Sequence, residues 1–401
     1  MQLNLTKKDI IRKSWILFLF LAVFGVLLNN IGKTLSLPNI FTLIRVLTLF
    51  LILLIINKKI LRHKYLSYFY LSLIFFVFCY LTISVLQGKL GYGLYFIRIY
   101  LEVLLVFYLS LYIKFFFNLK RFIDSIKFIG LLSSFFSLFT LYLFYTNSTF
   151  LNIIHASDEI NFNWFLGIGK FIYRAGFPIG GPNQLGLFYS ILIILSINFP
   201  FISKKKNTFY LSIFTLGLIS TFSKSAILVI LIYIILHNFK KISIFFYLIV
   251  ISVFSFYLLT LLDQYILEGR FLNYLDGFIN SKDESTEGHS NSILNAVYTF
   301  SEYSLSGYPK GTVGPRAQLF TDKYKNVESS FFIVLYDMGL LVAFIYTTTI
   351  TFLLKYAFSN KYQFYFLVSI FPVYFFLPVI HNIEISSLVF LIYVLIGSNK
   401  T

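Results

Sequence analysis

The strongest constraint on this chain is a series of apolar runs, each about 20 residues long, that recurs along its 401 residues. A helix of this length, at about 1.5 Å per residue, crosses the ~30 Å hydrocarbon core of a bilayer. Charged residues make up only 12% of the chain and hydrophobic residues 58%, which leaves too few polar groups to cover a water-soluble surface. The sequence therefore predicts an all-α polytopic membrane protein with about twelve transmembrane helices.

We expect transmembrane spans near residues 15–33, 39–57, 67–87, 93–113, 123–146, 184–203, 208–222, 225–239, 242–262, 328–354, 363–380 and 384–398. With a cytoplasmic N-terminus, the short basic clusters between spans all fall on the cytoplasmic side, as the positive-inside rule requires. These clusters are Lys58/Lys59/Arg62/Lys64, Lys114/Lys120/Arg121/Lys127, Lys204/Lys205/Lys206, Lys240/Lys241 and Lys355/Lys361. Membrane orientation thus accounts for the net charge of +17, and we expect cytoplasmic N- and C-termini and no nucleic-acid partner.

Two long loops, residues 147–183 and 263–327, interrupt this single transmembrane domain of residues 1–401 on the side away from the cytoplasm. They contain most of the carboxylates, so we expect the functional groups there. Helical spacing of apolar residues in 265–279 and 293–298 predicts two short helices on the membrane surface within the second loop.

The first loop ends in a segment, residues 174–186, that combines an arginine with Gly/Pro pairs. The planar guanidinium of Arg174 suits a phosphate, and Gly181 and Pro182 allow backbone amides to approach an anion before a helix begins at Asn183. An anionic headgroup site is one interpretation of this segment. A tight re-entrant turn with a structural arginine is the other, and the residues alone favour neither.

Three further polar positions are candidates for chemistry outside the apolar runs. His289 titrates near neutrality and can act as a base, although a loop histidine is more often only solvated. Glu328 opens a late span, where a carboxylate either reacts or caps the helix. Lys224 lies in a short outward turn, where it either contacts an anionic substrate or extends to the membrane surface.

Four charged residues, Arg45, Arg98, Glu102 and Asp337, fall within or at the edge of predicted spans. A charge there costs at least about 2.5 kcal/mol unless it is paired or hydrated, so such residues are functional candidates. Arg98 and Glu102 are four positions apart and would share a helix face, so they either form a structural ion pair with each other or serve as functional groups, and the residues alone favour neither.

The sequence offers no metal-ligand spacing, no nucleotide-binding glycine motif that its surroundings complete and no nucleophile elbow. Cys79 is the only cysteine, so neither a disulfide framework nor a thiolate metal cluster can form. We therefore expect no metal and no cofactor.

The order of several short motifs over about residues 90–355 resembles the O-antigen polymerase and ligase superfamily of membrane glycosyltransferases. The motifs are Arg174-x-Gly, Gly181-Pro182-Asn183-x-x-Gly186, Ser223-Lys224-Ser225, Gly288-His289-Ser290, Gly307-Tyr308-Pro309-Lys310-Gly311-Thr312, and Glu328-Ser329 before Gly339. Ligases of that family usually have a His-Asn pair where this chain has Glu328-Ser329, so the resemblance favours the polymerase.

This resemblance implies a GT-C-type membrane fold in the bacterial inner membrane. The implied reaction joins repeat units carried on undecaprenyl diphosphate, as donor and acceptor, at the extracytoplasmic face, without a metal. Membrane lipids and a chain-length regulator protein are the other implied partners. On this hypothesis Arg174, with Arg270 or Arg316 and Lys224, stabilises the leaving diphosphate, and His289 or Glu328 deprotonates the acceptor hydroxyl.

Two alternatives remain open at this stage. Within the same superfamily, the chain could be an O-antigen ligase or a protein oligosaccharyltransferase. From another class, a polysaccharide or lipid transporter or flippase would also have about a dozen spans and buried charges.

Overall fold

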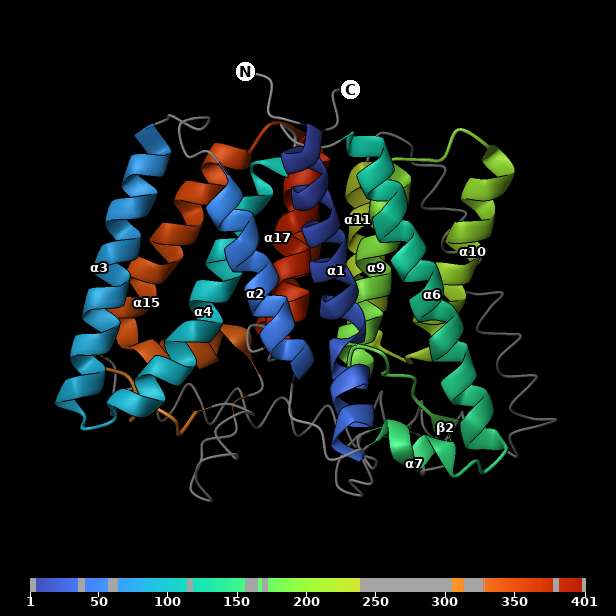
Figure 1. Ribbon diagram of the computed structural model, residues 1–401, viewed down its shortest axis with the longest axis horizontal. Coiled ribbons are helices and arrows are strands. Elements are labelled where there is room, and N and C mark those ends of the chain that lie inside the picture. Colours follow the sequence, from blue (N-terminus) through green and yellow to red (C-terminus); the bar gives the residue numbers. More distant parts are fainter. Residues whose placement is uncertain are drawn as a thin grey trace.

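The computed structural model describes residues 5–34, 40–56, 64–113, 118–155, 165–167, 172–238, 305–313, 327, 329–377 and 382–398. In these ranges the chain is almost wholly helical, and the long helices stand side by side in a bundle (Figure 1). The long helices are α1 (Leu5–Thr34), α2 (Ile40–Ile55), α3 (Lys64–Leu86), α4 (Leu90–Ser110), α6 (Leu119–Tyr145), α9 (Pro182–Asn198), α10 (Lys204–Ser220), α11 (Lys224–His237), α15 (Ser330–Ala357), α16 (Lys361–Phe376) and α17 (Ile383–Gly397).

The helices coincide with the spans expected from the sequence. Every predicted span except 242–262, which lies outside the described residues, falls on one of these helices. Among the described residues, five segments are long and apolar enough to cross a membrane: Asp9–Lys33, Tyr65–Leu86, Leu90–Ser110, Leu119–Tyr145 and Ser330–Ala357. The chain is therefore a helical membrane protein, while the number of twelve spans and the GT-C-type fold stay predictions.

Two helices, α9 and α17, form the centre of the bundle. Nearly every residue of each is buried, and the two helices pack against each other as well as against α10, α11, α4 and α16. Helices that are apolar on all faces are expected in such a central position. As a consequence, the N-terminal end of α9, where Asn183 lies, is fixed by neighbours on several sides.

Close contact between α9 and α11 depends on small residues. A Cβ atom on Gly186 would lie 2.7 Å from Cβ of Ser223 and 2.9 Å from Cβ of Ala226, so only glycine fits at this crossing. One turn further along α9, the Ser190 hydroxyl donates to the main-chain oxygen of Ala226 over 2.7 Å. Small residues that bring backbones together and hydroxyls that bond across helices are the usual means of packing in membranes.

One end of the bundle carries the short elements, and we call it the loop end. Helix α7 (Phe150–Ile154) and the two-residue antiparallel strands β1 (Leu166–Gly167) and β2 (Ile172–Tyr173) lie there, on the side of α6, and the segment 305–313 lies at the same end on the side of α3 and α15 (Figure 1). The two short helices predicted within 265–279 and 293–298 lie outside the described residues.

Basic residues gather at the opposite end of the bundle. Helices α6 and α10 begin there, and α15 ends there, with Lys120, Arg121, Lys204, Lys205, Lys206 and Lys355. This distribution agrees with the predicted cytoplasmic side, although the orientation itself stays a prediction.

Candidate functional site

Arg174 stands directly after β2 and is held by its backbone to the loop end of the bundle. Its amide donates to the Phe165 carbonyl over 2.6 Å, and the next amide, of Ala175, donates to the carbonyl of Ser220 over 2.9 Å. Ser220 is the last residue of α10. The end of the first loop is therefore joined to the end of a helix, which fixes where the arginine side chain starts.

Two acceptors in the described part of the chain orient the guanidinium of Arg174. Its Nη2 donates to Oδ1 of Asn183 over 3.0 Å, and its Nε donates to the main-chain oxygen of Thr221 over 3.3 Å. The side chain is half-buried, so the guanidinium has a defined direction and keeps contact with the surface. Such an arrangement can present a planar cation to an anionic ligand.

Asn183 is in turn positioned by the turn between α10 and α11. The fully buried hydroxyl of Ser223 donates to Oδ1 of Asn183 over 3.2 Å and also accepts from the amide of Ala226, which caps α11. Lys224 follows as the first residue of α11, and its side chain is exposed. We call Arg174, Asn183, Ser223 and Lys224 the Arg174 cluster.

Two helices begin at the Arg174 cluster, which adds to its positive potential. Helix α9 begins at Pro182, after the N-cap Gly181, and α11 begins at Lys224. Proline at the first helical position keeps the preferred φ and needs no amide partner. The N-terminus of a helix carries partial positive charge, so both helices, Arg174 and Lys224 attract the same kind of ligand, an anion.

An aromatic cluster around His155 packs beside the strand that precedes Arg174, and no residue pattern predicted it. His155 shares a hydrogen bond of 3.0 Å between its Nε2 and the Tyr173 hydroxyl, and the stacked rings of Phe165 and Phe177, 5.2 Å apart, flank it. Asn30 of α1 donates to the carbonyl of Ile154 over 3.0 Å and so joins this packing to the bundle. The signal in the sequence was a set of aromatic and aliphatic residues within the first loop.

The buried charges inside the bundle include an ion pair between helices. Glu102 of α4 forms an ion pair with Arg45 of α2 over 3.1 Å, and Arg45 also contacts Glu384 in the first turn of α17. Arg98, for which a pair with Glu102 was one of two interpretations, is exposed and lies over the ring of Tyr95, with 5.2 Å from Cζ to the ring centre. Helical spacing places Arg98 and Glu102 on one face of α4, but the carboxylate of Glu102 pairs with the buried Arg45 of the neighbouring helix α2.

Asp337 is buried in α15, 3% exposed, and accepts a hydrogen bond of 2.8 Å from the Tyr80 hydroxyl.

Four other residues predicted for the site, Arg270, His289, Arg316 and Glu328, lie outside the described residues, so their roles stay predictions. The structure thus brings Arg174 together with the Gly181-Pro182-Asn183 segment and with the turn that contains Lys224, 50 residues after Arg174.

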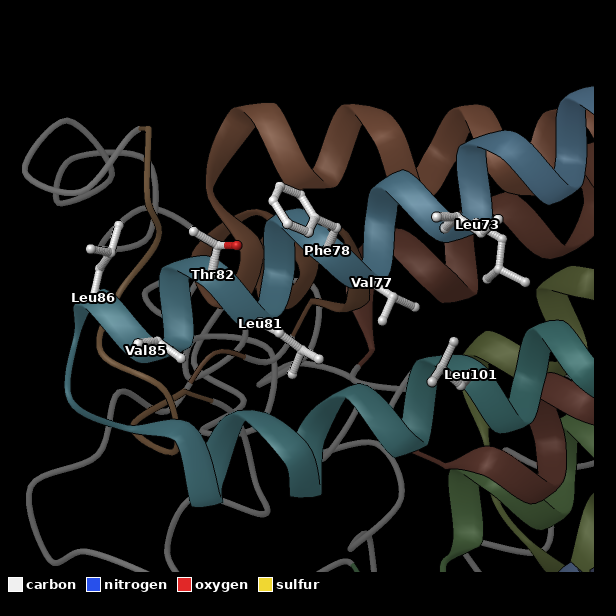
Figure 2. A pocket seen from close by; sticks show the side chains of 9 residues that line it. Leu73, Val77, Phe78, Leu81, Thr82, Val85, Leu86 and Leu101 are labelled. Carbon is white, nitrogen blue, oxygen red and sulfur yellow. The ribbon is translucent and has the colours of Figure 1, made fainter.

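A separate apolar groove runs along α3 and α4, on the side of the bundle away from the Arg174 cluster (Figures 1 and 2). Its volume is about 810 Å³, and its lining is aliphatic and aromatic except for Thr82. Leu73 and Leu86 mark its length on α3, and Leu101 faces it from α4 (Figure 2). It can accept a hydrocarbon chain, and it presents no group for chemistry.

In the part of the chain that the structure describes, no three histidine, cysteine, aspartate or glutamate side chains converge as a metal site would require. Comparison with known proteins finds no matching family model, no matching curated relative and no matching solved structure. The functional interpretation therefore depends on the geometry of the Arg174 cluster and on the chemistry of its side chains.

Proposed function

We propose that this chain is a membrane glycosyltransferase that joins repeat units of a surface polysaccharide, such as O-antigen, carried on undecaprenyl diphosphate. One observation carries the proposal: Arg174 and Lys224 stand at the N-termini of α9 and α11, at one end of an apolar helical bundle. A lipid-linked diphosphate has the matching chemistry, because its anionic group sits at the membrane surface while its hydrocarbon chain stays among lipids or helices.

The reaction needs charge stabilisation more than it needs a metal. The acceptor hydroxyl attacks C1 of the donor sugar, the bond from C1 to the diphosphate oxygen breaks, and the bonding electrons leave with the diphosphate. Arg174, Lys224 and the two helix N-termini stabilise the charge that develops on the leaving group. The hydroxyl proton passes to a base, for which His289 and Glu328 remain the predicted candidates.

The distribution of basic residues supports an extracytoplasmic site. Lys204 to Lys206 lie at the start of α10, and the other end of the same helix, at Ser220, bonds to the loop that carries Arg174. By the positive-inside rule the lysine end is cytoplasmic, so the Arg174 cluster faces the other side. We accordingly propose the bacterial inner membrane as the location, with both termini in the cytoplasm.

A transporter or flippase is the second candidate, and one observation favours it. Helix α15 is broken at Gly339, where φ is 70° and ψ is 169°, and broken helices beside buried charges are typical of transporters. The broken helix lies on the α3 side of the bundle, however, away from the Arg174 cluster (Figure 1).

Purified protein in liposomes separates the two candidates. With lipid-diphosphate-linked repeat units supplied and no ion gradient, the proposal predicts glycans of increasing length, which Arg174→Ala loses and the control Arg98→Ala keeps. Movement of substrate across the bilayer with no new linkage would identify a transporter.

In a deletion strain, a single repeat unit left on the acceptor identifies the polymerase, and loss of all repeat units identifies the ligase.

A further inference from the structure

The break in α15 is filled by the segment 305–313. A Cβ atom on Gly339 would lie 2.2 Å from the carbonyl oxygen of Leu305 and 2.5 Å from the amide nitrogen of Gly307. The amide of Tyr308 donates to the carbonyl of Tyr336 over 2.7 Å, and the two tyrosine rings stack at 4.8 Å. The segment therefore provides a donor for a helix carbonyl near the break.

Lys310 provides the second donor, through its side chain. The residue is 1% exposed, its Nζ donates to the main-chain oxygen of Asp337, and the same nitrogen lies 4.5 Å from the centre of the Tyr80 ring. The Tyr80 hydroxyl holds the Asp337 carboxylate at 2.8 Å. The amine thus meets a carbonyl at the end of a half-helix, the face of an aromatic ring and a nearby negative charge, three groups that all attract N–H donors.

The backbone of Lys310 is held as well. Its amide donates to Oε1 of Gln87, at the end of α3, over 3.2 Å, and Nε2 of the same glutamine donates to the carbonyl of Gly307 over 3.3 Å. The side-chain amide of Gln87, in the α3–α4 turn, therefore holds the segment at two points, Gly307 and Lys310. The contacts place the amine of Lys310 in one defined position between α3 and α15.

Burial of an amine in this position costs free energy, because the charged form loses its hydration. Burial lowers the pKa of Lys310, and the charge of Asp337 opposes that shift. A side chain of similar length without the nitrogen would fill the same space without this desolvation cost. What the nitrogen adds is a directed bond to the broken helix.

We propose that the break in α15 forms a buried site for a primary amine, which the chain occupies with its own Lys310, and that this occupancy holds the segment 305–313 on the bundle. The inference does not depend on the proposed glycosyltransferase function. Lys310 acts here as a positioning residue, and a shorter side chain at this place leaves a site that a small alkylamine from solution fills.

The test uses the accessibility of Val313, which is 2% exposed and follows Lys310 by three residues. In the full chain with Cys79→Ala, Val313→Cys gives one reporter thiol for a membrane-impermeant reagent. We expect slow labelling of this parent. Lys310→Ala should label about tenfold faster, because the directed bond of the amine is lost. Added n-propylamine should return the labelling of Lys310→Ala toward the parent rate. The matched control is Lys89→Ala, an exposed lysine in the α3–α4 turn, which should label as slowly as the parent.

n-Propanol, which has a similar size and also donates a hydrogen bond, separates a site for an amine from a site for any small donor. Equal restoration by n-propanol, or no restoration by n-propylamine, would overturn the amine site, and unchanged labelling of Lys310→Ala would overturn the anchoring role. If Lys310→Ala does not fold, Lys310→Met decides the anchoring role, because it keeps the stem and lacks the nitrogen. It should label faster than the parent, and labelling as slow as the parent would contradict the proposal.

Discussion

Arg174 donates a hydrogen bond of 3.0 Å to Oδ1 of Asn183, nine residues further along the chain, and Ser223 donates to the same oxygen over 3.2 Å. Asn183 therefore joins the end of the first loop to the turn between α10 and α11. Because its oxygen accepts from both sides, it sets the direction of the guanidinium without cancelling its charge.

This relationship predicts a graded effect of substitutions on polymer synthesis. Arg174→Ala removes the cation and should abolish the polymer, while Asn183→Ala leaves the cation but loses its acceptor and should lower the yield about tenfold, the equivalent of one hydrogen bond to a charged group. Asn183→Asp should be worse than Asn183→Ala, because a carboxylate neutralises the guanidinium. Glycan gels of a complemented deletion strain at equal protein levels measure all three, and equal yields for Asp and Ala would refute the charge argument.

A methyl group at Gly186, where α9 crosses α11, should also disturb the Arg174 cluster. Gly186→Ala places a Cβ atom 2.7 Å from Cβ of Ser223 and 2.8 Å from the Thr221 hydroxyl, so α11 has to move. Overpacking of this kind costs about 1–3 kcal/mol. We expect a lower melting temperature in detergent and shorter polymer, whereas Gly25→Ala, whose Cβ meets nothing within 4 Å, should lower neither.

The buried Arg45 is expected to matter for stability rather than for chemistry. Arg45→Met would leave the buried Glu102 and the partly buried Glu384 without their arginine, at a cost of about 3–5 kcal/mol in the free energy of unfolding. The triple variant Arg45→Met, Glu102→Gln, Glu384→Gln should recover most of this loss, because no uncompensated charge remains. Thermal unfolding in detergent measures the series, and a triple variant as unstable as Arg45→Met would contradict the explanation.

The lowered pKa of Lys310 predicts how docking of the segment 305–313 depends on pH. Burial favours the neutral amine, so between the lowered pKa and the ordinary value of 10.5 the undocked chain binds more protons than the docked chain. Docking should therefore strengthen as pH rises through this window. Labelling of Val313→Cys, normalised to that of the exposed Ser306→Cys, should slow as pH rises, and Lys310→Met should show no such change.

The sequence predicted the helices well because each apolar run is long enough to be unambiguous on its own. The resemblance implied that Arg174 and Lys224 act on one diphosphate, and the structure places the end of the first loop, with Arg174, beside the turn that contains Lys224. Arg270 and Arg316, the other residues of that hypothesis, lie outside the described residues. Side-chain partners were harder to predict. Glu102 pairs with Arg45 from another helix rather than with Arg98 on its own, and helical spacing contains no information about neighbouring helices.

The break in α15 shows the same limit. Gly339 and the Gly307–Thr312 motif were identified only as parts of the family resemblance, and no contact between them was predicted. Their contact depends on a positive φ at Gly339 and on the distance between two backbones, which no residue pattern specifies. Asp337 was recognisable as a candidate because a carboxylate within a span needs a partner, but the partners Tyr80 and Lys310 were not.

Binding of a polyprenyl diphosphate to purified protein tests the central claim most directly. The Arg174 cluster should bind the diphosphate with an affinity that falls about tenfold to a hundredfold in Arg174→Gln, the range for loss of a charge-assisted hydrogen bond. Arg98→Gln should bind as the unmodified chain does. Equal affinity of Arg174→Gln and the unmodified chain would contradict the assignment of this cluster to a lipid-borne diphosphate.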